Sequence, residues 1–124
     1  KSISKGSGKT TFRGLINVSK GAKNSKAHMK CDAIMLDKES KSDTIPSLQI
    51  NEEEVNVGHE ATVGKIGEDQ LFYLMSRGFS HEEAETLIVS GFFKQFVKEL
   101  PIEYAIEFNR LIELVMEDDK QNNN

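Results

Sequence analysis

Three residues of this chain carry side chains that could bind a metal ion or do thiol chemistry, namely Cys31, His59 and Glu60. Cys31 is the only thiol, and an unpaired cysteine most often serves as a small buried hydrophobic residue. His28 lies three positions before it, but a lone His-x-x-Cys pair has too few ligands for a closed zinc site. These residue types and spacings indicate a candidate metal or thiol site and identify no particular reaction.

The segment that carries His59 and Glu60 has the period of a β-strand. Apolar residues at alternate positions of residues 55–63 share a face with His59, and Glu60 points to the other face. The ordinary interpretation of such a position is a buried histidine bonded to a backbone carbonyl. For both side chains to reach one ion, the site would need a strand end, a bulge or a second subunit.

Residues 1–66 are predicted to form short strands and turns. Residues 10–18 are rich in β-branched side chains, and residues 29–36 alternate in a way that leaves part of both faces apolar. Glycines punctuate the first of these segments. Several short strands without hairpin dipeptides are compatible with a β-helix, although no repeat period is evident.

From Gly67 the pattern becomes helical, and residues 67–118 are predicted to form about three helices. Gly78 is expected to end the first helix, and Ser80 with Glu83 forms the capping box of the second. Pro101 fits the first turn of the third. Residues 119–124 are predicted to be a disordered polar tail.

The helical part is expected to have the denser core, because eight of the nine aromatic residues lie between Phe72 and Phe108. The spacing of three and four predicts two buried stripes. The first comprises Ala84, Leu87, Ile88, Gly91, Phe92 and Phe96, and the second comprises Ile102, Ala105, Ile106, Phe108, Leu111, Ile112 and Val115.

The net charge of -4 conceals an asymmetry, since residues 1–30 contain eight Lys or Arg and no Asp or Glu. These basic residues are spaced singly with almost no aromatic interleaving, so they are interpreted as solvent-facing strand positions and no nucleic-acid partner is expected. No apolar run is long enough to span a membrane, and no signal core is present. One cysteine fits a reducing compartment, so a cytoplasmic location is expected.

Ordered segments along residues 1–117 resemble the C-terminal region of the SufB/SufD family, which assembles iron–sulfur clusters. They are Ser-Ile-Ser-Lys-Gly at 2–6, Phe-Arg-Gly at 12–14, Cys-Asp-Ala at 31–33, Ile-Pro at 45–46, Gly-His-Glu-Ala-Thr at 58–62, Glu-Asp-Gln-Leu-Phe-Tyr at 68–73, Ser-Arg-Gly at 76–78 and Gly-Phe at 91–92. The resemblance implies a mixed β and α fold. It would be the end of a right-handed parallel β-helix (residues 1–66) followed by a C-terminal helical domain (residues 67–118), cut from a longer SufB-type subunit.

The resemblance also implies roles for the three candidate residues. Cys31 falls where SufB-type proteins carry the cysteine that accepts sulfur or ligates the cluster. Glu60 falls where they carry glutamate and SufD-type proteins carry glycine, and His59 falls on the histidine that SufD-type partners contribute. The implied cofactor is a transient iron–sulfur cluster in the full complex, with none expected in the isolated fragment.

The implied partners are a SufC-type ABC ATPase on the helical domain and a SufD-like or identical subunit through the β-helix. The residues expected to contact the ATPase are Glu68, Gln70, Phe72, Arg77, Phe92 and Phe93. The chain is then a scaffold and not an enzyme. Three alternatives are a SufD-like structural subunit that binds no iron, a stand-alone metal or thiol enzyme, and a nucleic-acid-binding module using the basic third.

Overall fold

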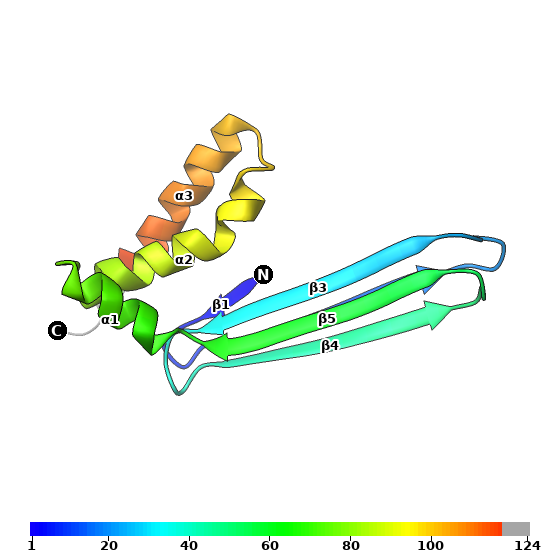
Figure 1. Ribbon diagram of the computed structural model, residues 1–124, viewed down its shortest axis with the longest axis horizontal. Helices are drawn as coiled ribbons and strands as arrows, with labels where there is room; N and C mark the ends of the chain where they lie inside the picture. The colour runs from blue at the N-terminus through cyan, green and yellow to red at the C-terminus, as the bar shows by residue number, and fades with distance from the viewer. Residues whose placement is uncertain (118–124) are drawn as a thin grey trace. The chain divides into compact units, whose positions relative to one another are not determined.

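The computed structural model describes residues 1–117 and divides into two compact units, Lys1–Ile66 and a second unit that begins at Gly67 (Figure 1). Within the described residues there are five strands in the first unit and three helices in the second. The predicted tail at 119–124, together with residue 118 of the predicted helical domain, lies outside the described residues. The mixed β and α fold is confirmed.

The strand unit is built from two parallel sheets. One contains β1, β3 and β5 in that order, and the other pairs β2 with β4. Successive long strands alternate between the two sheets, and their bounds are β1 Ser2–Ser4, β2 Lys9–Val18, β3 Lys26–Met35, β4 Lys41–Ile50 and β5 Asn56–Lys65. Parallel pairing with alternation between two sheets means that the chain winds forward in one direction. The right-handed parallel β-helix stays a prediction for this winding.

The register reveals a period that the sequence pattern conceals. Lys9 pairs with Lys41 in one sheet and Lys26 pairs with Asn56 in the other, so paired residues lie 32 and 30 positions apart. Paired positions share a face but mostly differ in residue type, as in the pair of Gly14 with Pro46. A search for recurring residues therefore finds no repeat, although the backbone has one.

The turns at one end of the strands are joined by the carboxylate of Asp37. It accepts hydrogen bonds from the Ser40 hydroxyl (2.8 Å) and from the backbone N–H groups of Ser40, Gly6 and Glu39. These bonds, the Ser40 hydroxyl first among them, lower the pKa of Asp37 below its ordinary value. One side chain thereby connects the turn after β1 to the turn after β3.

The basic residues of the first 30 positions face solvent as predicted, apart from half-buried Lys5. Several of their amino groups pair with carboxylates about one winding later along the chain. Lys9 lies 2.7 Å from Asp43, and Lys23 lies 3.4 Å from Glu54. Such exposed pairs add little stability individually, but they place acidic groups beside the basic third.

The helical unit comprises α1 Glu68–Ser76, α2 His81–Val97 and α3 Ile102–Glu117. The predicted capping box is confirmed, since the Glu83 N–H donates to Ser80 Oγ (3.2 Å) and the Ser80 N–H donates to the Glu83 carboxylate (2.8 Å). Gly78, with φ of +100°, ends α1 by donating its N–H to the Met75 carbonyl. None of these helices is long and apolar enough to cross a membrane.

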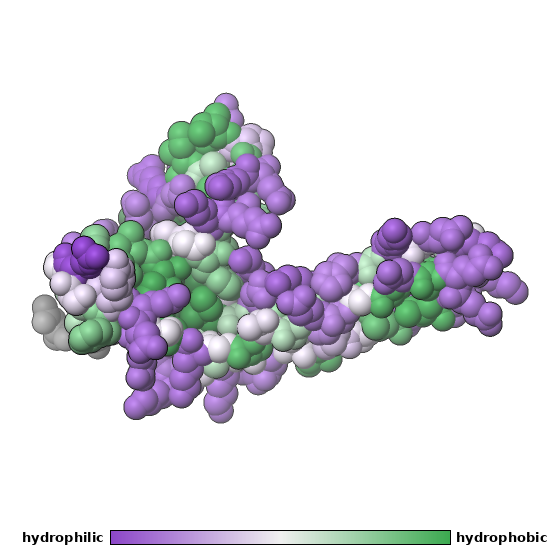
Figure 2. Space-filling view, in the orientation of Figure 1, coloured by the Kyte–Doolittle hydropathy of each residue, from purple (hydrophilic) through white to green (hydrophobic). Residues whose placement is uncertain are grey.

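The denser core predicted for the helical part is not found in residues 1–117, where each unit contributes four buried apolar residues. They are Val18, Cys31, Ala33 and Leu36 in the first unit, and Leu71, Ala84, Val89 and Met116 in the second. Phe93 and Phe96 each pack edge-to-face on Phe108, but Phe96 is 47% exposed. Most of the α3 stripe is exposed as well, including Ile102, Ile106, Leu111 and Val115, and apolar surface is visible over the helices in Figure 2. Because α3 packs against α2 on one side, much of its wide apolar stripe is left uncovered by the other described residues of the unit.

Candidate functional site

Cys31 lies in the middle of β3, which is the central strand of its sheet. It pairs in register with Ala61 of β5, and β1 pairs with the following residues from Ala33 to Met35. Its side chain points to the same face as Ala33, and both residues are buried, Cys31 being 9% exposed. The predicted alternation of this strand is confirmed, and the thiol faces the protein interior.

His59 lies on the neighbouring strand, on the same face as Cys31. It pairs in register with Met29, two residues before Cys31, so the Cα atoms of His59 and Cys31 are about 8 Å apart by strand geometry. Within residues 1–117 the buried Nε2 atom of His59 has no hydrogen-bond partner. A buried polar atom without a partner costs roughly 1–3 kcal/mol, so a ligand or a donor that reaches this nitrogen would be favoured.

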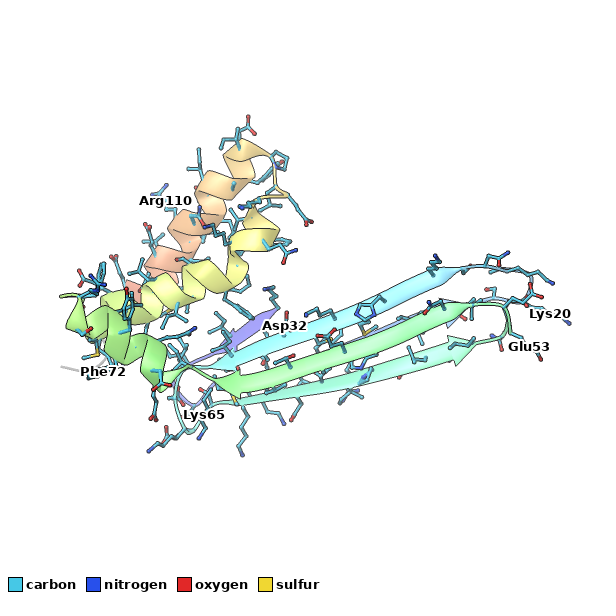
Figure 3. All side chains as sticks on the ribbon, viewed as in Figure 1. Lys20, Asp32, Glu53, Lys65, Phe72 and Arg110 are labelled. Atoms are coloured by element: carbon cyan, nitrogen blue, oxygen red, sulfur yellow. The ribbon has the colours of Figure 1, made fainter. Side chains whose placement is uncertain are left out.

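Glu60 lies on the opposite face of β5, as the alternation predicts. Its carboxylate accepts a hydrogen bond from Lys30 Nζ at 2.9 Å, and His28 Nε2 lies 3.8 Å from it. The Lys30 hydrogen bond lowers the pKa of Glu60, and the same bond raises the pKa of Lys30. Side chains project from β3 and β5 in Figure 3. The side chain of Glu60 is 51% exposed and lies on the outer face.

The structure thus brings together two of the three candidate residues. Cys31 and His59 share a face on adjacent strands, whereas Glu60 is engaged on the other face. In the part of the chain that the structure describes, no group of three or more His, Cys, Asp or Glu residues could hold a metal ion. A closed metal cage is therefore not formed by the described residues alone.

The close approach of the Met29 side chain to Gly14 was not predicted from the sequence. A Cβ atom added at Gly14 on β2 would lie 2.8 Å from Met29 Sδ, so the Met29 side chain crosses to the opposing sheet. Met29 is also the register partner of His59. The signal was present, because Met29 alternates in phase with Cys31, but the opposing glycine becomes meaningful only once the two sheets face each other.

The residues expected to contact an ATPase fall into two sets. Glu68, Gln70 and Phe72 are exposed on α1, where Phe72 is 75% exposed, and Arg77 at the end of α1 stacks over the ring of Tyr73 at 5.2 Å. Phe92 and Phe93, by contrast, are half-buried and pack edge-to-face on one another. The first set forms an accessible surface, whereas Phe93 of the second set packs on Phe108 of α3.

Comparison with known proteins now gives these features a context. Residues 1–92 match the family described as SUF system FeS cluster assembly, SufBD core domain. The chain belongs to the SufBD family. Its family relatives include an iron–sulfur cluster assembly SufBD family protein of Mycobacterium bovis, 55% identical over 117 residues. Another, from Staphylococcus aureus strain USA300, is 51% identical over 117 residues.

Both matches cover nearly all of this chain and a minor part of the relatives. They cover 94% of this chain, with 14% of the mycobacterial protein and 25% of the staphylococcal protein. A third relative, from Mycobacterium leprae, is 55% identical over 117 residues as well. Family membership connects the chain to iron–sulfur cluster assembly, while its own contribution to that process has to be argued from its residues.

Proposed function

We propose that this chain provides the site that holds sulfur or a nascent cluster in a SufB-type scaffold, with Cys31 as the thiolate and His59 as an accessory ligand. The observation that supports this most directly is the buried Nε2 atom of His59, which has no hydrogen-bond partner within residues 1–117 and lies on the same face as the buried Cys31 thiol. The cluster is cargo in this proposal and is passed on after assembly.

The chemistry of these donors suits a site that releases its product. One thiolate and one imidazole hold iron less firmly than four thiolates do, and mixed nitrogen and sulfur ligation changes the properties of a cluster. Glu60 cannot join them from the same side of the strand. Its participation requires that Lys30 release it and that a second subunit bring its own donors to the outer face, which would let two subunits share the ligands.

We further propose that a SufC-type ATPase docks on the helical unit and that a SufD-like or identical subunit pairs with the strand unit. The exposed apolar side chains of α1 support the first part, since Phe72, Tyr73 and Met75 are 75%, 55% and 45% exposed on one short helix, and exposed apolar side chains that gather in one place are typical of interaction sites. Nucleotide hydrolysis then belongs to the ATPase, and this chain acts as a scaffold without an activity of its own.

The alternative function is a SufD-like structural subunit that pairs and docks without binding iron. It is favoured by the engagement of Glu60 with Lys30. In that case Cys31 is a small buried core residue, and the buried Nε2 atom of His59 only lowers the stability of the fold.

The two functions are separated by anaerobic iron–sulfur reconstitution of the protein expressed from its own gene with its partner subunits, followed by visible absorption. Cys31→Ala should abolish the cluster signal. Since it removes one buried atom of methylene size, it should cost only about 1 kcal/mol of stability. Val18→Ala is the matched control, because Val18 is 5% exposed in the other sheet and its truncation costs at least as much without touching the thiol.

The outcomes separate clearly. Loss of the signal in Cys31→Ala with retention in Val18→Ala supports the scaffold function. An unchanged signal in Cys31→Ala contradicts the ligand assignment and leaves the structural function. Equal loss in both variants means that destabilisation alone removes the cluster, which also contradicts the assignment.

A further inference from the structure

A groove of about 330 Å³ lies between the start of α2 and the end of α3. Its apolar lining is formed by Phe79, Leu87 and Met116. Met116 is buried, but Phe79 is 42% exposed and Leu87 is 45% exposed. The groove thus presents two large apolar side chains to whatever enters it.

The rest of the lining is strongly acidic. Four glutamates surround the apolar residues, and within residues 1–117 none of them forms an ion pair; they are Glu82, Glu83, Glu113 and Glu117. The described helical unit carries ten Asp or Glu against four Lys or Arg. The groove is therefore a focus of negative charge in a unit that is negative as a whole.

A stabilising effect on the helices accounts for the presence of only two of these four glutamates. Glu82 and Glu83 lie in the first turn of α2, where the helix dipole favours negative charge, and Glu83 also completes the capping box. Glu117 is the last residue of α3 and Glu113 lies one turn before it, and the last turn of α3 carries no basic residue. There the dipole disfavours negative charge, and like charges four residues apart repel. These two residues therefore lower the stability of the helix, and within residues 1–117 no ion pair compensates for that cost.

We propose that this groove binds a basic amphipathic helix of a partner protein, with an aliphatic side chain resting on Leu87 and flanking lysine or arginine side chains facing the glutamates. Apolar anchoring in a groove is a common mode of helix recognition, and charge complementarity selects the basic partner. None of the residues that line the groove belongs to the exposed α1 set Glu68, Gln70, Phe72 and Arg77. The inference is thus independent of where the ATPase docks.

The test uses two synthetic helical peptides that share a leucine face, one flanked by lysines and the other by glutamates. Binding to the whole protein is measured by fluorescence anisotropy at low and moderate salt. The groove variant is the double change Glu113→Gln with Glu117→Gln. Its matched control is Glu103→Gln with Glu107→Gln, a pair with the same spacing on the same helix outside the groove.

The lysine peptide should bind and the glutamate peptide should not, with affinity falling as salt rises. The groove variant should bind the lysine peptide about fivefold more weakly, as expected for two partly exposed charge pairs, while the control stays within about twofold. The groove variant should also unfold at an equal or higher temperature because a repulsion is removed, so weaker binding cannot be ascribed to loss of fold.

Leu87→Ala provides a second probe that changes no charge. It should weaken the binding of the lysine peptide, because it removes the apolar anchor. Equal binding of the two peptides, or an equal loss in the groove variant and its control, would overturn the proposal. The proposal would also be overturned if the protein self-associates, if the groove variant abolishes that self-association, and if the lysine peptide does not inhibit it. A second copy of the protein would then be the occupant of the groove.

Discussion

The orphaned nitrogen of His59 leads to a prediction in which stability and function move in opposite directions. Replacement of His59 by leucine keeps a side chain of similar size on the inner face of β5 and removes a buried polar atom that has no partner within residues 1–117. Relief of an unsatisfied buried group is worth roughly 1–3 kcal/mol. Since His59 is only partly buried as a residue, we expect a gain of about 1 kcal/mol.

The assay is thermal unfolding followed by circular dichroism, with cluster content measured on the same samples after reconstitution. A gain of about 1 kcal/mol in a unit of this size raises Tm by about 4–8 °C. Cluster content should fall in the same variant, because the proposed accessory ligand is gone. A site that serves function at the expense of stability is expected to show this combination.

His28→Leu is the matched control, since it makes the same chemical change on the adjacent strand and the outer face. The side chain of His28 is 58% exposed and lies beside Glu60, so its replacement should change stability by less than about 0.5 kcal/mol and leave cluster content unchanged. A lower Tm in His59→Leu would refute the reasoning, because it would show that Nε2 has a stabilising partner in the native protein.

Three further predictions concern the fold. Ser80→Ala removes one half of the capping box with Glu83 and should cost about 1 kcal/mol, measured as a lower Tm of the helical signal. Gly78→Ala introduces a Cβ at a φ of +100° and should cost about 1 kcal/mol or more, and an unchanged Tm would show that the end of α1 relaxes freely. Lys30→Met should lower Tm at neutral pH and have progressively less effect as the solution is acidified through the lowered pKa of Glu60. The sign follows because a carboxyl group with a depressed folded pKa stabilises the fold above its unfolded pKa and loses that contribution on protonation; a difference that persists at acid pH would mean that Lys30 acts through packing.

Much of the candidate site was predictable because strand alternation is a local property. The phase of residues 55–63 was enough to place His59 on the apolar face and Glu60 on the other, whereas the pattern of residues 29–36 left part of both faces of the Cys31 strand apolar. The capping box at Ser80 and the stop at Gly78 were predictable for the same reason, since each acts over a few residues of contiguous chain. Family membership, too, is carried by short ordered segments of sequence.

The contacts that give the site its character were not predictable in this way. The bond between Lys30 and Glu60 joins residues 30 positions apart, and it exists because β3 and β5 pair in one particular register. The orphaned Nε2 of His59 and the crossing of Met29 over Gly14 depend on which side chains the opposing sheet presents. The neighbouring residues along the chain do not indicate any of these contacts.

The sequence by itself determined the opposite faces of His59 and Glu60, where the first two helices are capped, and which family the chain belongs to. The tertiary structure alone decided that paired strand residues lie 32 or 30 positions apart along the chain. It also decided the partner of Glu60 and the wide exposure of α3. The physical reason is one of range: caps and alternation are settled by neighbours along the chain, whereas pairing and burial depend on residues brought together only after a whole winding has closed. An apolar stripe predicts what a helix can bury, and only the packed unit shows how much of that stripe stays exposed.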